Sequence, residues 1–238
     1  MTRVSVCMAT YNGALYLREQ LDSILSQLYP EDELIVSDDH STDDTRPIVA
    51  SYQDARIRLI TNPGKRRHVQ NFAHAMEHAT GEFIALSDQD DIWTENRLER
   101  MLDQLRRMPQ YSLVVGDVTE FDGSGVLAIQ AALGPCPRRR LVQMSGIFRG
   151  KFRYFGSAFL FRKDLTRYIL PVPAYIEAHD IWIAMNAALL GKIAHLEETT
   201  LMRRLHENNM TPRRRRDLWR VVRSRACYLA GLLQSSFR

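Results

Sequence analysis

The sequence is poor in cysteine and has no long apolar run. Its 238 residues include three cysteines, Cys7, Cys136 and Cys227, which lie far apart and form no CxxC or Cys/His metal-binding pattern. An odd number of unpaired cysteines excludes a disulfide scaffold and indicates a reducing compartment. No stretch approaches the roughly 20 apolar residues that cross a bilayer, and the first residues lack the apolar stretch of a signal peptide. We therefore expect a cytoplasmic globular protein with a core large enough to fold without metals or disulfides.

Charge is distributed unevenly along the chain. The formal net charge is +4, from 32 basic and 28 acidic residues. Residues 212–238 contain eight arginines and one acid, Asp217, so this segment carries a charge of +7 and residues 1–211 carry a charge of −3. The basic character of the protein therefore describes its tail and says little about the main domain.

Short apolar runs alternate with helical patterns through the first half of the chain. The expected strands span residues 4–9, 34–36, 57–60, 82–86 and 113–115. The expected helices span about residues 13–28, 41–52, 69–79 and 98–108. This alternation predicts an α/β fold with a mainly parallel sheet and helices on both faces, in which ligands bind at the carboxyl ends of the strands.

The pattern beyond residue 116 is less regular. Residues 118–121 and 126–129 flank the turn pair Asp122-Gly123 and predict a hairpin. We expect further strands at residues 155–161 and 199–202, a helix from Lys163, and a buried helix at residues 181–190.

The segment Asp88-Gln89-Asp90-Asp91 follows the fourth expected strand. Three carboxylates so close together repel one another unless a cation lies among them, and hard oxygen ligands suit Mg²⁺ or Mn²⁺ bridged to substrate phosphates. The alternative is that these acids cap the following helix, although Thr94 is also placed to do so. We favour a metal–diphosphate site.

Polar residues also follow the first two expected strands. Asp38 and Asp39 are suited to hydrogen bonds with a base or ribose, or else they form a turn that caps the next helix. Tyr11 either stacks on a base or packs on the core. The basic loop of residues 65–68 faces phosphates or is simply a solvated run of charge.

Two further positions carry acid–base chemistry or merely support a helix. Asp180 precedes the buried helix and is either a general base or the N-cap of that helix. His206 lies in a basic stretch after the last expected strand, and a lone histidine is more often structural.

The motifs together resemble those of family 2 glycosyltransferases with the GT-A fold, in particular bacterial rhamnosyltransferase-like members. The similarity covers roughly residues 3–210, with its motifs in order at residues 4–13, 37–43, 71–72, 81–93, 179–182 and 206–209. The stretch Arg203-Arg204-Leu205-His206 departs from the Tyr-Arg-x-His of many relatives, and the loop at Gly156 lacks their cysteine.

The resemblance implies an inverting transfer of a sugar from a UDP or dTDP donor, dTDP-rhamnose among them, to a glycan or lipid-linked acceptor in cell-surface polysaccharide (O-antigen) synthesis. Asp180 would be the catalytic base. The nucleotide-sugar site would contain Thr10, Tyr11, Asn12, Asp38, Asp39, Lys65, Arg67, Asn71, Asp88 and Gln89. Gly156, Ser157 and Trp182 would contact the acceptor, and Asp90, Asp88 and His206 would bind Mg²⁺ or Mn²⁺.

Residues 211–238 are expected to form a basic amphipathic helix appended to a domain of residues 1–210. Such a helix lies on an anionic membrane surface, which would place the protein peripherally on the inner face of the cell membrane. The alternative is a helix that docks on the domain or on a second subunit in a homodimer. No fold for nucleic-acid binding is recognised. Two other functions stay open at this stage, a nucleotidyltransferase and a non-catalytic adaptor on the membrane surface.

Overall fold

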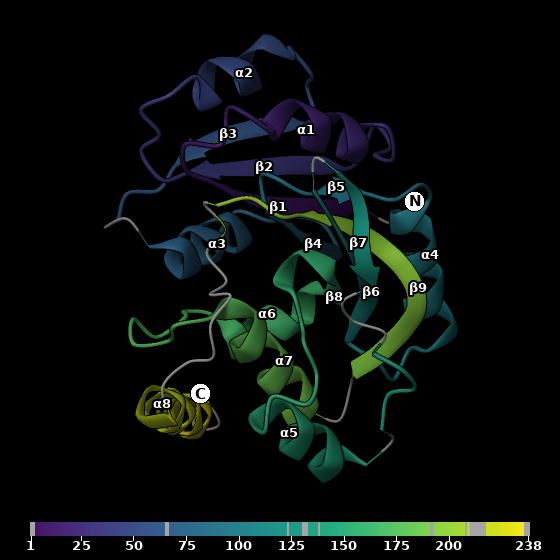
Figure 1. Cartoon of the computed structure of the whole chain (residues 1–238), viewed down its shortest axis with the longest axis vertical. Helices are drawn as coiled ribbons and strands as arrows, with labels where there is room; N and C mark the ends of the chain where they lie inside the picture. The colour runs from purple at the N-terminus through teal and green to yellow at the C-terminus, as the bar shows by residue number, and fades with distance from the viewer. Residues whose placement is uncertain are drawn as a thin grey trace.

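A computed structural model describes residues 3–64, 67–122, 124–129, 133–137, 139–190, 193–207, 209 and 218–235. Its described strands form one nine-stranded sheet in the order β3-β2-β1-β4-β8-β6-β9-β5, and β7 pairs with β6 outside this path. Helices cover both faces of the sheet (Figure 1). The predicted α/β class is confirmed.

The first half of the sheet is parallel, as the alternating pattern predicts. Its strands are β1 (Val4–Thr10), β2 (Glu33–Asp38), β3 (Ile57–Thr61) and β4 (Phe83–Ser87). The connecting helices are α1 (Leu17–Leu25), α2 (Thr45–Ser51) and α3 (His68–Glu77). Every carboxyl end of these strands therefore reaches the same edge of the sheet.

The second half of the sheet is mixed in strand direction, and it contains the hairpin predicted at residues 118–121 and 126–129. Its strands are β5 (Ile92–Trp93), β6 (Leu113–Asp122), β7 (Gly125–Ile129), β8 (Phe159–Arg162) and β9 (Ile193–Arg204). Strand β8 runs antiparallel to both β4 and β6, whereas β9 runs parallel to β6 with two shifts of register near Asp117. The segments predicted as separate strands at 113–115 and 118–121 are one continuous strand.

The remaining helices lie mostly beyond β6. They are α4 (Arg97–Arg107), α5 (Arg140–Phe148), α6 (Thr166–Ile169), α7 (His179–Leu189) and α8 (Leu218–Ser235), with short 3₁₀ turns η1 (Gly156–Ala158) and η2 (Lys163–Leu165). Helix α5 and strand β5 are not among the predicted elements. The buried helix expected at 181–190 is α7.

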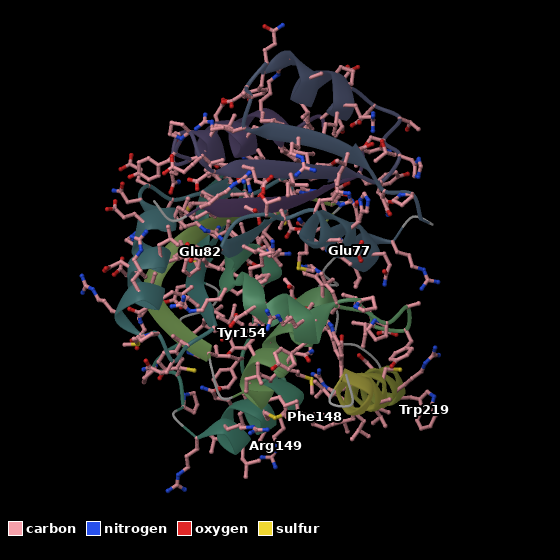
Figure 2. The ribbon with its side chains drawn as sticks, turned by 180° about the vertical axis from the view of Figure 1, so that it is seen from behind. Glu77, Glu82, Phe148, Arg149, Tyr154 and Trp219 are labelled. Carbon is pink, nitrogen blue, oxygen red and sulfur yellow. The ribbon has the colours of Figure 1, made fainter. Side chains whose placement is uncertain are left out.

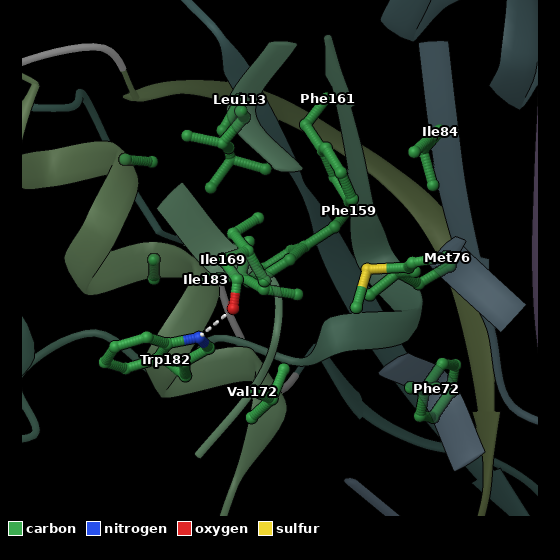
Figure 3. Close-up of a cluster of buried hydrophobic side chains, with 14 of the residues drawn as sticks. Phe72, Met76, Ile84, Leu113, Phe159, Phe161, Ile169, Val172, Trp182 and Ile183 are labelled. Atoms are coloured by element: carbon green, nitrogen blue, oxygen red, sulfur yellow. Dashed lines mark hydrogen bonds between the residues drawn. The ribbon is translucent and has the colours of Figure 1, made fainter. Parts of the chain in front are cut away.

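Two hydrophobic cores fill the two faces of the sheet. Alternate residues of a strand point to opposite faces, so Val6 and Met8 of β1 pack with α1 and α4 while Cys7 packs with α3 and α7. The core that contains Cys7 also includes Phe159 and Trp182. The Nε1 atom of Trp182 donates a hydrogen bond to Ile169 O at 2.9 Å (Figure 3). Helices α6 and α7 are therefore attached to the sheet through the packing of their buried side chains.

Glu33, the first residue of β2, connects the amino-terminal ends of the parallel strands through hydrogen bonds. Its buried carboxylate accepts hydrogen bonds from Ser5 Oγ at 2.7 Å, from Thr80 N at 2.8 Å and from Arg58 Nη1 at 3.2 Å. Burial by itself raises the pKa of Glu33, but these hydrogen bonds outweigh it and lower the pKa to about 2.

Helix α8 docks on α7 through a close helix–helix contact. A Cβ atom on Gly231 would lie 2.7 Å from the Trp182 ring, and Tyr228 and Leu232 are buried in the core beneath the helix. The other side of α8 exposes Trp219 (73%) and Leu233 (64%), and Trp219 lies at the outer side of the molecule in Figure 2. No helix in the described part of the chain is long and apolar enough to cross a membrane.

Candidate active site

The loops after β1 and β2 are held together by buried hydrogen bonds. Asp38 is completely buried, and its carboxylate accepts hydrogen bonds from Thr10 Oγ1 at 3.1 Å, Ser41 N at 3.1 Å and Arg46 Nη1 at 3.3 Å. Asn71 on α3 donates to Thr10 O at 3.2 Å. Asp38 and Asn71 thus shape the edge of the sheet from within.

Asp39 lies next to this framework at the start of the loop after β2. Its backbone N–H donates to Thr10 O at 2.8 Å, and its Oδ1 atom accepts a hydrogen bond from Asn62 Nδ2 at 2.9 Å. Asn62 follows β3 and has no distinguishing sequence pattern, so sequence reasoning missed it. Asn12 lies in the loop between β1 and α1 and has a positive φ of 48°. Its side chain accepts a hydrogen bond from Thr42 N at 2.8 Å, which connects this loop to the loop after β2.

Gln89 connects the loop after β1 to the acidic segment after β4. Tyr11 N donates to Gln89 Oε1 at 2.8 Å, and Gln89 Nε2 donates to Tyr11 O at 3.1 Å. This reciprocal pair holds the backbone of Tyr11 beside Asp88 and leaves 43% of the Tyr11 residue exposed. The two loops, 78 residues apart in sequence, form one rim.

The acidic segment contains carboxylates in different environments. Asp91 is buried, and burial together with the charges of Asp90 and Asp88 raises its pKa well above the ordinary value. Burial also raises the pKa of Asp88, opposed by the charges of His68 and Arg203. Helix α4 begins at Arg97, and none of its described cap contacts comes from these acids. The capping alternative for this segment is therefore not supported.

The contacts of Asp91 indicate a structural role. Its Oδ1 atom accepts a hydrogen bond from Arg204 N at 3.1 Å, and its charge opposes the loss of charge on buried Arg97, whose pKa burial lowers to about 9. The Arg97 guanidinium also donates to Ser157 O at 2.5 Å and covers the Trp93 ring at 4.2 Å.

Asp90 and His206 meet at this rim. Asp90 Oδ2 lies 2.8 Å from His206 Nε2, and the His206 ring packs on Tyr16 with ring centroids 5.0 Å apart. The Arg204 guanidinium donates to Asp90 O at 3.2 Å and pairs with Glu19 at 2.6 Å. Within the described ranges, no three His, Cys, Asp or Glu side chains group closely enough to hold a metal by themselves.

Asp180 lies in the first turn of α7, beside a cavity of about 210 Å³. Its Oδ1 atom accepts a hydrogen bond from Ile181 N at 2.6 Å. Glu120 of β6 and Arg203 of β9 line the same cavity and form an ion pair at 2.6 Å. Arg203 in the cavity lining is followed on β9 by Arg204, whose guanidinium donates to Asp90 O at 3.2 Å, so this strand connects the cavity to the acidic rim.

The residues expected to contact an acceptor separate into two groups. Gly156 and Ser157 are buried at the turn η1, where a Cβ atom on Gly156 would lie 2.3 Å from His179 Nε2 and where the carbonyl oxygen of Ser157 accepts the hydrogen bond from Arg97. Trp182 is 1% exposed, and its one polar atom is bonded to Ile169 O in the core. The expectation that Trp182 contacts the acceptor directly does not fit this placement.

The basic loop is only partly described. Lys65 and Arg66 lie outside the described residues, and exposed Arg67 donates from Nη1 to Ala174 O at 2.8 Å. His68 packs edge-on to His179 with centroids 5.0 Å apart, and its charge lowers the pKa of Asp88. His68 thus joins the rim, while the Arg67 guanidinium is tied to the loop before α7.

Sequence reasoning also missed Glu120, Arg203 and His179. Glu120 and Arg203 are 83 residues apart and meet only because β6 and β9 pair. His179 stands beside Asp180 in the sequence, but its contacts with Phe72 and Gly156 depend on the packing of α3 and η1. Of these three residues, only His179 could have been found from the sequence, because it is the neighbour of the candidate base Asp180.

Comparisons with known proteins agree with this architecture. The family model described as "Glycosyl transferase family 2" matches residues 5–170. The chain is 38% identical over 102 residues to the Escherichia coli UDP-Glc:alpha-D-GlcNAc-diphosphoundecaprenol beta-1,3-glucosyltransferase WfgD, covering 43% of this chain and 40% of that protein. The chain spans about half the length of the curated relatives that it matches.

Solved structures show the same fold. The S. aureus TarS 1–349 structure in complex with UDP-GlcNAc has a TM-score of 0.76 at 21% identity, covering 99% of this chain and 69% of that one. The mannosyltransferase PcManGT from Pyrobaculum calidifontis, in complex with GDP-Man and Mn²⁺, has a TM-score of 0.64 at 23% identity, covering 100% of this chain and 64% of that one.

Proposed function

Because the chain belongs to glycosyl transferase family 2 and has the GT-A fold, we propose that it transfers a sugar from a nucleoside-diphosphate donor to a hydroxyl group of a glycan or lipid-linked acceptor in cell-surface polysaccharide synthesis. One observation carries this proposal. The loops with Asp39, Asp88 and Asp90 share a single rim of the sheet, and strand β9 connects the cavity beside Asp180 to that rim.

The donor lies along the rim formed by the loops after β1, β2 and β4. The exposed ring of Tyr11 stacks on the base, and Asn12 and the loop at Asp39 line the nucleoside, while Thr10, which is 1% exposed, supports that loop from within. Asp38, Asn71 and Gln89 act by holding these loops in place. Lys65 and Arg67 are assigned to the diphosphate on charge alone. A UDP-sugar is the first donor to test because WfgD is named for UDP-Glc and TarS binds UDP-GlcNAc.

Asp88, Asp90 and His206 would hold Mg²⁺ or Mn²⁺ together with the donor phosphates. The donor set fits, since Asp90 Oδ2 and His206 Nε2 already converge to 2.8 Å, and such ions commonly use one or two carboxylates and complete their shell with substrate phosphates. The cation would stabilise negative charge on the departing diphosphate. The PcManGT structure, which contains Mn²⁺, supports this assignment by analogy.

Asp180 accepts the proton of the acceptor hydroxyl as that oxygen attacks the anomeric carbon. The new bond joins the acceptor oxygen to the anomeric carbon, and the bond to the diphosphate oxygen breaks on the opposite face. A single displacement of this kind inverts the configuration. Glu120 and Arg203 neutralise each other next to Asp180, so neither competes for that proton.

The test combines binding and turnover. The melting temperature is measured with UDP-glucose, UDP-GlcNAc and dTDP-rhamnose, each with and without Mn²⁺, because a ligand specific for the folded state stabilises it. Asp180→Asn should abolish transfer and keep the donor-induced shift, while Asp90→Asn should lose the Mn²⁺-dependent part of that shift. Asp103→Asn, at an exposed position on α4, is the control.

Analysis of the reaction products distinguishes a glycosyltransferase from a nucleotidyltransferase and from a non-catalytic adaptor. A glycosyltransferase releases a nucleoside diphosphate, whereas a nucleotidyltransferase releases pyrophosphate, and an adaptor releases neither. Full turnover in both the Asp90→Asn and Asp180→Asn variants would refute the assignment of these residues.

Residues 211–238 are proposed as a membrane-binding unit, with an anionic bilayer as the partner. Helix α8 buries Tyr228 and exposes a stripe at helical spacing that contains Trp219, Leu229 and Leu233. The run of four arginines before α8 complements anionic headgroups, and tryptophan favours the interface. Under this proposal the protein would lie on the inner face of the cell membrane.

Sedimentation with vesicles tests this contact. Binding to phosphatidylglycerol vesicles should exceed binding to phosphatidylcholine vesicles, and Trp219→Ser with Leu233→Ser should reduce it. Leu141→Ser, at an exposed leucine on α5, should have no effect. Equal binding to both vesicles, or a homodimer in solution that the Trp219→Ser, Leu233→Ser variant dissociates, would contradict the membrane assignment.

A further inference from the structure

The cavity beside Asp180 is small, and much of its wall is apolar. Its volume of about 210 Å³ lies below the ~300–1,000 Å³ of typical ligand pockets. Strands β6 and β9, helices α5, α7 and α8 and the loop of residues 150–155 supply its lining. Apolar surface comes from Ile147, Phe152, Phe155 and Ile181. The cavity therefore suits one sugar ring, which has an apolar face, rather than a long glycan.

The charged groups of the lining are paired. Arg203 Nη1 donates to Glu120 Oε1 at 2.6 Å, and both side chains are about nine-tenths buried. Arg153, Arg225 and Asp180 have partners of their own. A charged ligand would have to compete for groups that are already paired, and separating a buried pair is costly. A ligand without net charge meets this lining without breaking any pair.

The Glu120–Arg203 pair keeps hydrogen-bonding capacity for such a ligand. Among the described residues, its bond at 2.6 Å is the one hydrogen bond that either side chain makes. This bond uses one carboxylate oxygen and one guanidinium nitrogen, so a second oxygen and further N–H groups are left. A hydroxyl group is both donor and acceptor, and it bonds strongly to charged partners of both signs. The pair is therefore suited to recognise a hydroxyl.

The pair is held by the sheet and not by a loop. Glu120 and Arg203 are register partners in the parallel pairing of β6 and β9. The Arg203 guanidinium also lies over the Phe155 ring, 4.9 Å from its centroid, which restricts its orientation. Asp180 belongs to the first turn of α7. Recognition by groups on rigid elements is precise, because their separation from the candidate base is fixed.

We propose that the Glu120–Arg203 pair determines acceptor specificity by binding one hydroxyl of a neutral sugar ring while another hydroxyl of the same ring lies at Asp180. The proposal rests on the proposed function, because Asp180 is the base only if the chain is a glycosyltransferase. The ring packs on the apolar wall that contains Phe152 and Ile181. The reacting unit of the acceptor is accordingly a neutral hexose or N-acetylhexosamine, and any phosphate or lipid attached to it lies outside the cavity.

A scan with deoxy sugars tests this recognition. Calorimetric titration, with UDP and Mn²⁺ in excess, measures binding of the methyl glycosides of glucose, galactose, N-acetylglucosamine, rhamnose and glucuronic acid. The monodeoxy analogues of the tightest neutral glycoside are then titrated into the wild type and into Glu120→Gln. Loss of one ring hydroxyl should cost about tenfold or more in the wild type, because a site built to bond a hydroxyl rejects the analogue that lacks it. The same loss should cost less than about threefold in Glu120→Gln, where the carboxylate is absent.

Two double variants separate recognition from structural damage. Glu120→Leu with Arg203→Met replaces the buried pair by apolar side chains of similar size, which often leaves stability intact. This variant should also lose the discrimination between the glycoside and its deoxy analogue. Asp103→Leu with Arg107→Met removes an exposed ion pair of α4 outside the cavity lining and should keep that discrimination.

The possible results are distinguishable. A hydroxyl preference that Glu120→Gln and the Glu120→Leu, Arg203→Met variant lose, and that the α4 variant keeps, supports the proposal. It is overturned by a preference that Glu120→Gln retains, by equal affinity for the glycoside and all its deoxy analogues, or by no binding of any glycoside. Tighter binding of the glucuronic acid glycoside than of every neutral one overturns it as well.

Donor binding is measured in parallel. If Glu120→Gln weakens the binding of UDP-glucose but not that of UDP, the recognised hydroxyl belongs to the donor sugar and the acceptor assignment falls. If UDP and UDP-sugars fail to bind while the deoxy scan succeeds, the proposed function falls and the saccharide site stands.

Discussion

A methyl group at position 156 tests whether the turn before β8 positions the start of α7. A Cβ atom on Gly156 would lie 2.3 Å from His179 Nε2 and 2.9 Å from its Cδ2 atom. Since non-bonded heavy atoms settle near ~3.5–4.0 Å, the His179 ring has to move by about 1 Å. Its motion is opposed by Phe72, whose ring stacks on it at 4.2 Å.

The expected cost follows from overpacking a filled core. Forcing one extra methyl group into such a site costs about 1–3 kcal/mol, and each kcal/mol lowers the melting temperature of a protein of this size by about 2–4 °C. Relief of this contact by a shift of the backbone at the start of α7 would move the Asp180 carboxylate as well, because Asp180 follows His179 directly. A misplacement of about 1 Å can lower turnover by about 100-fold. UDP binding should stay unchanged because the donor loops are elsewhere.

A double-mutant cycle identifies the cause. Gly156→Ala is compared in the wild-type and His179→Ala backgrounds by urea denaturation and by steady-state transfer rates. Its cost should largely disappear when the imidazole is absent, giving a coupling of about 1–2 kcal/mol. Gly64→Ala, where the nearest atom lies 3.4 Å away, is the control. An equal cost of Gly156→Ala in both backgrounds would show that the ring contact is not responsible.

Two further predictions concern the ends of the parallel strands. Glu33 has a folded pKa of about 2 against an ordinary 4.5, so it contributes about 3 kcal/mol of stability that is complete above pH 4.5 and is lost as the pH falls toward 2. Glu33→Gln should therefore show a flatter loss of stability over that range in urea titrations; parallel curves for the two proteins would contradict this. Gln89→Ala removes both hydrogen bonds to the Tyr11 backbone, worth about 1 kcal/mol each, and should weaken UDP binding without changing the response to acid. Unaltered UDP affinity in calorimetry would mean that this pair does not shape the nucleotide site.

Local patterns predict the first half of the fold because each strand and helix there is defined by its own residues. The alternation of buried runs with amphipathic helices also predicts that the loops after β1, β2 and β4 share one edge, which the bond between Tyr11 and Gln89 confirms. Strands β1, β2 and β3 pair with their neighbours in the chain, whereas β4 pairs with β1 and not with β3.

The second half depends on contacts between distant segments. Strand β9 reads locally as a short strand at residues 199–202, but pairing with β6 extends it from Ile193 to Arg204. The cavity draws Glu120, Arg203 and Arg225 from three elements that no spacing relates. Trp182 illustrates the opposite error, since its place in a motif suggests a binding role while packing against Ile169 and Gly231 puts it in the core.

The pleat of β9 assigns successive arginines to different tasks. Arg203 lines the Asp180 cavity, while Arg204, the next residue, bonds Asp90 O and Glu19 on the other side of the strand. The irregular pairing on either side of Asp117 determines which of the two points each way. Deleting one residue of β9 between this irregularity and Arg203 would turn each guanidinium group to the opposite side of the strand, so the phase of a single strand sends one arginine to the cavity and the next to Asp90.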